Sequence, residues 1–572
     1  MRSSDRFANA GGSHCRSTVD AMADPLAAFF AHYYRRYPVN ATFTGVHEFD
    51  ARLPDWSPDG LDALGDEARA LQFALGPEQP DVRALSETGA RDRALARSAL
   101  DVQIAELGSQ HFHRRNPSLF VGEAAFGVIA LMTRPFAPAA ARVDSATARL
   151  GAVPAFFGGA RRLLTAGIPD VWRDKTLREC EGVDRLFGDC MRRWLTAEPV
   201  DGRRADRLLD AARAARAAAR DFAAWLSREA APAPPTALAC GPELFDRLLT
   251  HGHWCTEGRA SLLFRAEAAL DEALARLDGR AAAQGGWSEV QARLADVHPQ
   301  VDDYLTTYER IWRACLSRAE ACDLVTWPVD PLRYVAIPAH TRDAAPYLYY
   351  LFYRSPAPFD ALPVHDYVVT PIDADMPEDE RDRRLRATNT SVITLNHVVH
   401  HGAIGHHVQN GHAYRCPSTI GKVAAVDCAS RIGLFLGGTM AEGWACYATD
   451  LMDEVGFFSP DESLAQQHTR ARLIARAVAD IRLHEGSLSF DQVVALYRDR
   501  IAMTPEAARA EACKNAMFPG TAVMYWLGTD TLHALRRSRE RAEGAGFSLR
   551  RFHDEVLSYG SIPVPLIARL MG

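Results

Sequence analysis

Apolar residues recur every three or four positions along most of this 572-residue chain. The segments 92–110, 205–230 and 259–283 show the period most clearly, with the apolar residues set among strong helix formers such as Ala, Leu, Arg and Glu. Such a period forms an apolar stripe along one side of a helix, and the stripe has to be buried against other helices. The sequence therefore predicts a mainly α protein with a large helical fold.

Two stretches interrupt this helical pattern. Closely spaced prolines in APAPPTALACGP, at 231–242, end the preceding helix and favour extended backbone. We therefore divide one integrated unit into an N-terminal helical region, 1–230, and a second helical region, 231–572. The stretch 327–371 is rich in Pro, Tyr and Val, which favours short strands. We expect a small irregular or β-containing region there, directly before a cluster of histidines.

Composition and charge exclude several classes of partner. The chain is 48% hydrophobic and 24% charged, and its formal net charge of −7 comes from interspersed acids and bases. No basic face is offered to a nucleic acid or to an anionic membrane, so we expect neither as a partner. The Arg-rich helix faces are interpreted as solvated surface. The composition leaves the oligomeric state open.

Cysteine usage and hydropathy indicate a compartment. The eleven cysteines form no CxxC pair, which is typical of reduced, mostly buried thiols. The sequence contains no apolar run as long as a membrane span, and its N-terminus lacks the apolar stretch of a signal peptide. We therefore expect a soluble, cytoplasmic protein.

Histidines gather in one short segment, LNHVVHHGAIGHHVQ, at 395–409. Imidazole nitrogens are good ligands for zinc and for other divalent transition metals. Five of the twenty histidines in eleven positions therefore indicate a metal or catalytic site. These residues are His397, His400, His401, His406 and His407.

The spacing of the histidines leaves the ligand pair open. His400 and His407 would share a face of a straight α-helix but lie about 10 Å apart along it, too far for one ion. Gly405 can allow a bulge or break that brings His406 back toward His400.

Two competing pairs need no such distortion of the helix. His397 lies three residues before His400 and four residues before His401, so it can share a helix face with either of them.

A third ligand is expected from another segment. Glu442 is the best candidate, because in GTMAEGWACYATDLMDEVG it opens an apolar helical run about forty residues downstream. A glutamate at such a place is by itself typical of a helix N-terminus, where the dipole favours it. It becomes a ligand candidate only in company with the histidines.

Both motifs resemble those of the bacterial DUF885 family, whose landmarks read approximately HEAxPGHHxQ and EGWALYAE. In this chain the first reads HHGAIGHHVQ, at 400–409, and the second reads EGWACYAT, at 442–449. The resemblance runs nearly end to end. The other segments that match in order and spacing are 33–57, 241–253, 480–486, 518–528 and 552–563.

The resemblance implies a mostly helical, metallopeptidase-like fold with a zinc site, in a family few of whose members have an assigned substrate. Carried over residue by residue, it assigns His400, His406 or His407, and Glu442 to the metal. Zinc would polarise a carbonyl and lower the pKa of a bound water toward 7.

The same resemblance places three further residues near the presumed site. They are His484, Glu511 and Tyr525. A Tyr or His side chain can donate a hydrogen bond to an oxyanion. His484 and Tyr525 are therefore further catalytic candidates.

Departures from the family motif fall at positions that carry chemistry. His401 stands where the family has the glutamate after its first histidine, so the expected general base is absent. Thr449 replaces the second acidic residue of the EGWALYAE landmark, and Lys514 and Asn515 replace an Arg-Tyr pair. Such a pattern indicates redirected or lost catalysis rather than random surface drift.

Three hypotheses follow. In the first, the protein is a metal-dependent hydrolase of an amide or peptide bond, with zinc or another divalent transition metal and with His401 as the base. In the second, His401 enters the coordination sphere, and the enzyme runs a non-hydrolytic reaction on a small molecule in a biosynthetic pathway. In the third, the protein binds a peptide or a partner without catalysis. The first is preferred, with a small-molecule or peptide substrate.

Overall fold

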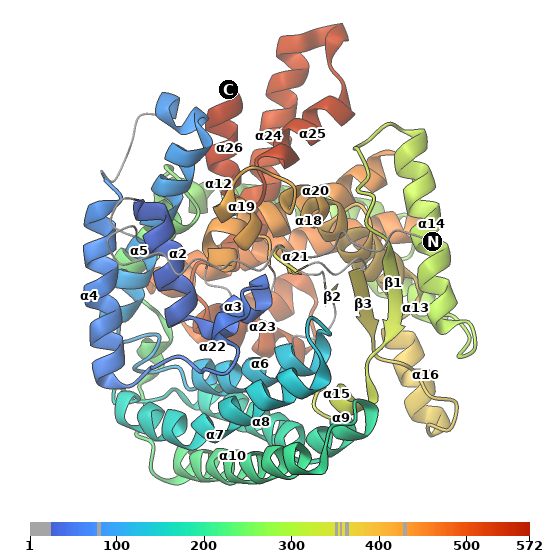
Figure 1. The fold of residues 1–572 in the computed structure, drawn as a ribbon. Coiled ribbons are helices and arrows are strands. Elements are labelled where there is room, and N and C mark those ends of the chain that lie inside the picture. The colour runs from blue at the N-terminus through green and yellow to red at the C-terminus, as the bar shows by residue number, and fades with distance from the viewer. Residues whose placement is uncertain (1–23, 77–81, 349–352, 355–356, 361–364, 427–431) are drawn as a thin grey trace, which may run out of the picture.

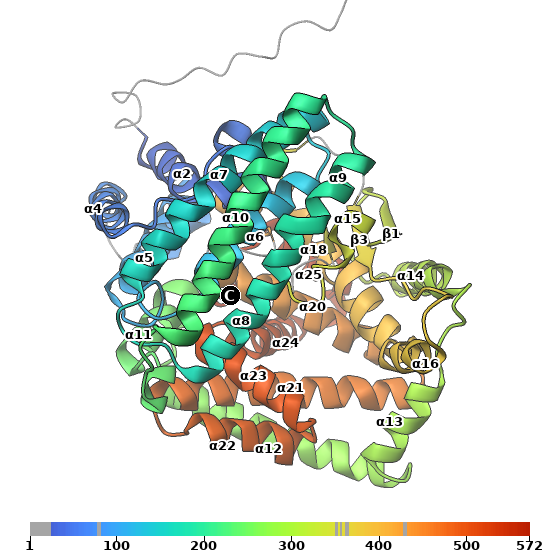
Figure 2. The same cartoon turned by 90° about the horizontal axis from the view of Figure 1, so that it is seen from below.

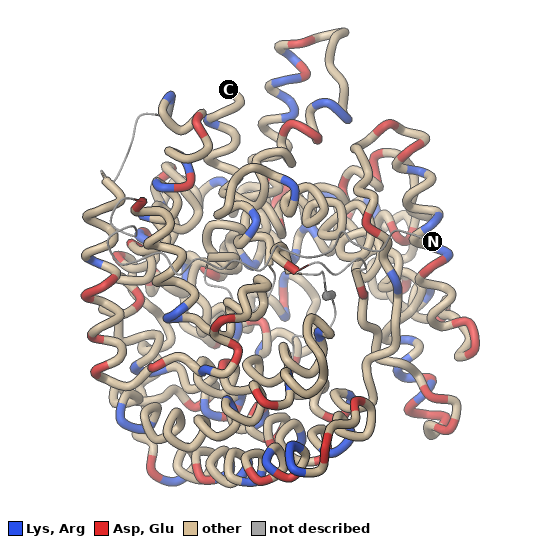
Figure 3. The backbone as a smooth tube through the Cα atoms, viewed as in Figure 1, with Lys and Arg blue, Asp and Glu red and all other residues tan. Residues whose placement is uncertain are grey.

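The structure is a computed structural model that describes residues 24–572 except 77–81, 349–352, 355–356, 361–364 and 427–431. Helices form most of the described chain (Figure 1), which confirms the predicted mainly α fold. The three segments with the clearest period form the helices α5 (Thr88–Gly108), α10 (Gly202–Arg228) and α12 (Arg259–Ala282). Acidic and basic residues are interspersed along them (Figure 3).

The N-terminal half packs around one apolar helix, α6 (Ser118–Thr133). Every residue at 120–132 is buried, because α7 and α8 pack against α6 and α10 covers both in turn. Figure 2 shows α7, α8 and α10 running side by side over one face of the molecule. The other helices of this half are α2 (Pro25–Arg36), α3 (Pro38–Thr44), α4 (Pro58–Ala74), α7 (Ala139–Leu163), α8 (Asp170–Arg185) and α9 (Met191–Ala197).

The C-terminal half contains the long helices α20 (Gly438–Glu454), α21 (Pro460–Glu485) and α24 (Val523–Glu543). The helix α12 packs along α21, and α24 crosses α20. The remaining helices here are α11 (Pro242–Arg247), α13 (Trp287–Asp296), α14 (Tyr304–Ala321), α15 (Ala339–Arg342), α16 (Glu378–Ala387), α17 (Thr390–Val392), α18 (His406–Ala413), α19 (Thr419–Val423), α22 (Phe490–Ala495), α23 (Pro505–Met517), α25 (Leu549–Ser558) and α26 (Val564–Met571).

Short helical turns of other types connect these elements. The π-helical turns are η3 (Leu186–Cys190), η5 (Leu248–Gly252), η6 (Ile393–Gly402), η7 (Gly433–Gly437) and η8 (Leu496–Arg500). The 3₁₀ turns are η1 (His47–Phe49), η2 (Val82–Ser86), η4 (Pro235–Leu238) and η9 (Gly544–Gly546). Within the described ranges, no helix is long and apolar enough to cross a membrane.

Local sequence signals fix the ends of α21. The Ser459 side chain accepts a hydrogen bond from the backbone N–H of Glu462, and the Glu462 carboxylate accepts one from the backbone N–H of Ser459. This capping box satisfies two N–H groups of the first turn. At the other end, Gly486 has a φ of 83°, a left-handed conformation that glycine adopts without steric cost. These two signals set where α21 begins and where it ends.

The described residues of the region 327–371 form three short strands, as predicted. The strands are β1 (Leu332–Ala336), β2 (Tyr353–Arg354) and β3 (His365–Val369), in the order β1-β3-β2. β1 pairs with β3 in parallel, and β2 pairs with β3 antiparallel. The sheet lies next to the histidine segment, since the Tyr367 hydroxyl on β3 lies 2.6 Å from His397 Nδ1.

One hydrophobic core runs through both halves of the chain. It includes Phe120 and Trp172 from before the predicted boundary at 231 and Trp444 and Tyr447 from after it. The prolines of the boundary segment do end α10, and α11 begins only at Pro242. The boundary therefore separates two helices that share a core.

His47 links the N-terminal helices to the segment between β2 and β3. Its Nδ1 lies 2.9 Å from Asp50 and its Nε2 lies 2.8 Å from Asp360, and its ring stacks on Phe136 at 3.8 Å between centroids. Burial opposes the charged form, but the hydrogen bonds with Asp360 and Asp50 outweigh it and raise the pKa of His47 to about 9. Protonation of His47 therefore favours the folded state.

This raised pKa predicts a loss of stability at alkaline pH. The stabilisation is fully present below the unfolded pKa of about 6.5 and is lost as the pH rises through 9. We expect the free energy of unfolding to fall by about 1–2 kcal/mol over that window, because solvent screens part of the interaction of this partly exposed ring. Urea denaturation at a series of pH values measures the fall, and His47→Gln should remove it. Equal slopes in the two proteins would contradict the assignment.

Candidate metal centre

The histidine segment is π-helical in its first part and α-helical in its second part. The π-helical turn η6 ends at Gly402, the chain departs from helical geometry at 403–405, and α18 begins at His406. Across this break the backbone N–H of Gly405 donates to the carbonyl of Val399 at 2.9 Å. The π-helical part spans ten residues, longer than the single turns in which π-helices mostly occur.

The break expected at Gly405 is present, and only glycine fits there. A Cβ at this position would overlap the carbonyl oxygen of His400. Because the backbone approaches so closely, the ring of His406 comes back to that of His400, with 4.9 Å between the ring centroids. The break thus brings the imidazoles of His400 and His406 closer together than a straight α-helix would.

Two tryptophans donate hydrogen bonds to backbone carbonyl groups at the break. The indole N–H of Trp444 donates to the carbonyl of Ile404 at 2.9 Å, and that of Trp312 donates to the carbonyl of Gly402 at 2.7 Å. Buried carbonyl groups need such partners. Since Trp444 follows two residues after Glu442, its bond also fixes α20 against the histidine segment.

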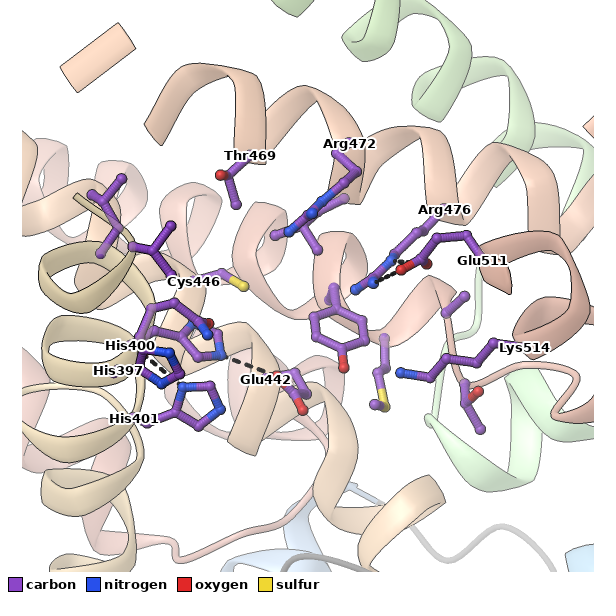
Figure 4. Close-up of a pocket in the computed structure, with 18 of the residues that line it drawn as sticks. His397, His400, His401, Glu442, Cys446, Thr469, Arg472, Arg476, Glu511 and Lys514 are labelled. Carbon is purple, nitrogen blue, oxygen red and sulfur yellow. Dashed lines mark hydrogen bonds and ion pairs between the residues drawn. The ribbon is translucent and has the colours of Figure 1, made fainter. Parts of the chain in front are cut away.

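Three imidazoles and one carboxylate converge at this point. Nitrogen atoms of His400, His401 and His406 lie within 4.8 Å of one another, and they form the one group of this kind among the residues that the structure describes. Glu442, in the second turn of α20, places an oxygen 3.4 Å from His400 Nε2 and 3.7 Å from His406 Nε2. Figure 4 shows Glu442 directed at the histidines.

His401 is oriented by the backbone of its own π-helix. Its Nδ1 lies 2.7 Å from the carbonyl of Asn396, a distance at which Nδ1–H donates to that oxygen. This bond fixes the tautomer and leaves the lone pair of Nε2 available. A backbone partner on the second ring nitrogen is typical of metal-bound histidines.

Burial keeps His401 and His406 neutral, and neighbouring groups keep the Glu442 carboxylate ionised. Burial lowers the pKa of His401 well below its usual range, and burial lowers that of His406 to about 4. Burial would raise the pKa of Glu442, but the hydrogen bond with His400 and the nearby imidazoles hold it far below its usual value. Neutral imidazole and ionised carboxylate are the forms that bind a cation.

The donor set fits a divalent transition metal. Two ligands bound at about 2.1 Å to one tetrahedral ion lie about 3.4 Å apart, close to the separations between Glu442 and the imidazoles. His400, His406 and Glu442 would then hold the ion, with His401 beside it. The structure thus brings His401 into the same group as His400 and His406.

The structure does not bring His407 to this cluster. Its ring is fully buried and contacts His365, with 5.0 Å between centroids. His397 lies outside the group of three, and its Nδ1 is 2.6 Å from the hydroxyl of Tyr367. Of the two neighbours His406 and His407, only the first contributes to the group of three.

The other two predicted catalytic residues occupy different environments. His484 is fully buried, accepts a hydrogen bond from the N–H of Cys240 at 3.1 Å and bonds the carbonyl of Asn515 at 3.0 Å. Both ring nitrogens are thus committed to backbone, and His484 does not line the cavity described next. Tyr525 does line that cavity, with the guanidinium of Arg476 5.2 Å from its ring centroid.

The cluster opens on a cavity of about 1180 Å³ between the two halves of the chain. Its wall includes parts of α6, α13, η6, α20, α21, α23 and α24. His400, His401 and Glu442 lie on one side (Figure 4). The volume accommodates a ligand of several residues or a comparable small molecule.

The sequence matches the model of a family described as "Bacterial protein of unknown function (DUF885)" over residues 38–571. The chain belongs to the DUF885 family. No curated protein matches it. A "putative lipoprotein of unknown function" from Shewanella oneidensis is 20% identical, with a TM-score of 0.76 over 96% of this chain and 99% of that one. A "putative lipoprotein" from Colwellia psychrerythraea is 15% identical, with a TM-score of 0.74 over 96% and 98%.

The cavity of this DUF885 protein also contains cations that the sequence analysis missed. Arg472 and Arg476 on α21 and Lys514 on α23 line it (Figure 4). The interpretation of Arg-rich helix faces as solvated surface is wrong for Arg476, whose side chain is 12% exposed and pairs with Glu511. The available signal was the spacing of four, which places Arg472 and Arg476 on one face of a helix.

Proposed function

We propose that this protein is a metal-dependent hydrolase of amide or peptide bonds. His400, His406 and Glu442 would hold the ion, zinc or another divalent transition metal, and His401 would act as the general base. The proposal is supported chiefly by the separations of 3.4 and 3.7 Å between Glu442 and the two imidazoles, at the wall of a cavity of about 1180 Å³.

A bound divalent ion would supply Lewis acidity to the amide carbonyl and activate a water. The neutral His401 would take the proton of that water at Nε2, while its Nδ1–H stays bonded to Asn396. As the C–O bond forms and the C–N bond breaks, the same nitrogen would return the proton to the leaving amine. Tyr525, on the cavity wall, is the candidate donor to the carbonyl oxygen.

A second candidate has a specific observation in its favour. The ring nitrogens of all three histidines lie within 4.8 Å of one another, so His401 Nε2 can also enter the coordination sphere. The protein would then be a non-hydrolytic metalloenzyme acting on a small molecule, since no base remains beside the ion. Imidazole-rich sites of this kind also accept iron, copper or nickel.

His401 variants separate the two candidates. We expect the purified protein to contain close to one equivalent of metal, and we expect His401→Ala to keep it while losing at least about a hundredfold in hydrolysis. His401→Glu restores the family residue and should recover hydrolysis. Elemental analysis, with mass spectrometry of a peptide mixture, measures both quantities. Loss of metal in His401→Ala would favour the second candidate, and no metal-dependent turnover would contradict both.

A cytoplasmic location is part of the same proposal. It agrees with the interspersed charges and with the free cysteines, most of which are buried. Fractionation of cells, with the protein followed by antibody, tests it. Recovery in the membrane or periplasmic fraction would contradict it.

A further inference from the structure

A fully buried carboxylate contacts the turn that precedes α24. Asp480, on α21, accepts hydrogen bonds from three backbone N–H groups of this turn. Gly520 donates to one carboxylate oxygen at 3.3 Å, and Ala522 and Val523 donate to the other, each at 3.1 Å. The first N–H groups of a helix have no partner within the helix, and the N-cap residue of α24, Ala522, has no side chain able to accept from them. Asp480 therefore caps α24 from a neighbouring helix.

The turn that this carboxylate holds forms part of the cavity wall. Thr521 and Ala522 line the cavity, and so does Tyr525 in the first turn of α24. His253 fixes the turn a second time, since its Nε2 lies 2.6 Å from the carbonyl oxygen of Gly520. The backbone that leads into Tyr525 is thus held by side chains that are themselves fully buried.

The helix α21 contacts the region of Tyr525 at two places. Arg476 and Asp480 lie four residues apart and share a face of that helix. The guanidinium of Arg476 lies 5.2 Å from the ring centroid of Tyr525, and Glu511 fixes this guanidinium by two hydrogen bonds, at 2.7 and 2.6 Å (Figure 4). One face of α21 therefore sets both the ring of Tyr525 and the backbone from which it extends.

A glycine contact fixes α24 against the helix that carries Glu442. A Cβ on Gly443 would lie only 2.6 Å from the Cα of Gly528, so the backbones of α20 and α24 touch at this crossing. Gly443 follows Glu442 directly, and Gly528 lies three residues after Tyr525. The first two turns of α24 therefore pack against the part of α20 that contributes the candidate metal ligand, and both Tyr525 and Glu442 line the same cavity.

The burial of this acid is offset by the bonds it makes to the turn. Burial raises the pKa of Asp480 to about 8, and the three backbone N–H groups oppose the rise. His484 Nε2 lies 3.5 Å away but donates to the carbonyl of Asn515, and burial lowers the pKa of His484 to about 4, so this imidazole stays neutral. An apolar side chain at 480 would fill the space without making any of the three bonds.

We propose that Asp480 is a positioning residue, which sets the start of α24 so that Tyr525 meets the substrate beside the histidine cluster. Asp480 is fully buried and acts through the backbone of residues 520–523. This inference rests on the proposed function for the chemical role of Tyr525, the candidate donor to the carbonyl oxygen. The position of Tyr525, in contrast, is tested without any reaction.

Fluorine NMR of the full-length protein tests the positioning without a substrate. All sixteen tyrosines are replaced by 3-fluorotyrosine, and the Tyr525 signal is the one that disappears in Tyr525→Phe. In Asp480→Asn the amide oxygen can still accept from Ala522 and Val523, but the NH₂ group faces the N–H of Gly520, and that bond is lost. We expect the Tyr525 signal to move or split by more than its linewidth, and to move further in Asp480→Ala, which loses all three bonds.

Asp450→Asn is the matched control for this measurement. Asp450, on α20, is also a buried carboxylate, and it contacts His533 further along α24 at 2.9 Å. This variant should leave the Tyr525 signal in place. If Asp480→Ala does not fold, Asp480→Asn carries the test, because it keeps the size of the side chain. An unmoved Tyr525 signal in Asp480→Asn, or an equal shift in the control, would overturn the inference.

A double-mutant cycle tests the chemical consequence, on a peptide that the unaltered, metal-loaded protein cleaves in the mixture described above. Tyr525→Phe should lower kcat about a hundredfold, because an oxyanion donor is lost. Asp480→Asn should lower kcat about tenfold with little change in KM, since a misplaced donor chiefly weakens contact with the transition state. In the Tyr525→Phe background the same substitution should cost less than about twofold. Equal losses in the two backgrounds would contradict a role that acts through Tyr525.

The two measurements separate this inference from the proposed function. A moved Tyr525 signal, without hydrolysis by the unaltered protein, would support the positioning role and count against the hydrolase. Hydrolysis by the unaltered protein, with an unmoved Tyr525 signal in Asp480→Asn, would support the hydrolase and overturn the positioning role.

Discussion

His400→Ala is expected to lose the bound metal and, with it, all measurable hydrolysis. His400 is the residue whose Nε2 lies nearest to Glu442, at 3.4 Å, so its removal takes one ligand and leaves the carboxylate without its main partner. Removing one of the ligands should cost at least about a hundredfold in metal affinity, since each ligand contributes several kcal/mol. Elemental analysis after dialysis against a weak chelator measures the loss, and Glu442→Gln should behave alike.

His397→Ala is the matched control for this prediction. His397 lies on the same π-helix and lines the same cavity, but its Nδ1 bonds Tyr367, and it is outside the group of three. We expect this variant to keep the metal. Full metal content in His400→Ala, or loss of metal in His397→Ala, would show that the ion is held by the competing pair of the undistorted helix.

The helices could be predicted from sequence because their signals are local. An apolar period, a capping box and a terminal glycine act within one or two turns, and α5, α10 and α12 follow the predicted segments closely. The strands at 332–369 were predictable for the same reason, since the Tyr and Val residues there favour an extended backbone.

The geometry of the histidine segment could not be predicted in the same way. Gly405 indicated that a break was possible, but the π-helix and the departure at 403–405 depend on carbonyl partners far away in the sequence. Trp312 and Trp444 provide those partners. Sequence spacing therefore left open whether His406 or His407 faces His400, and only the tertiary packing orients the two rings.

The cations of the cavity show a second limit of sequence reasoning. The spacing of four places Arg472 and Arg476 on one helix face, but nothing local shows that this face is buried rather than solvated. Their environment is set by the packing of α21 against α20, α23 and α24, which encloses the cavity. Burial of a charged side chain is a tertiary property, whereas helix propensity is a local one.

Gly405→Ala is expected to abolish metal binding even though it removes no ligand. The added Cβ would overlap the carbonyl oxygen of His400, which is backbone and cannot rotate away. The chain must shift there, and the short approach between His400 and His406 is lost with it. We expect a cost of about 1–3 kcal/mol in stability, as for other overpacked sites, together with metal content below about a tenth of the normal value.

Gly151→Ala is the matched control, because Gly151 lies inside α7 with no other heavy atom within 4 Å of a Cβ placed there. That substitution should raise stability by about 0.5–1 kcal/mol, since alanine is the better helix former. Thermal unfolding and elemental analysis measure both variants. If Gly405→Ala held a full equivalent of metal, the backbone break would not be what brings His406 to His400. The ligand assignment would then have to rest on side-chain rotation alone.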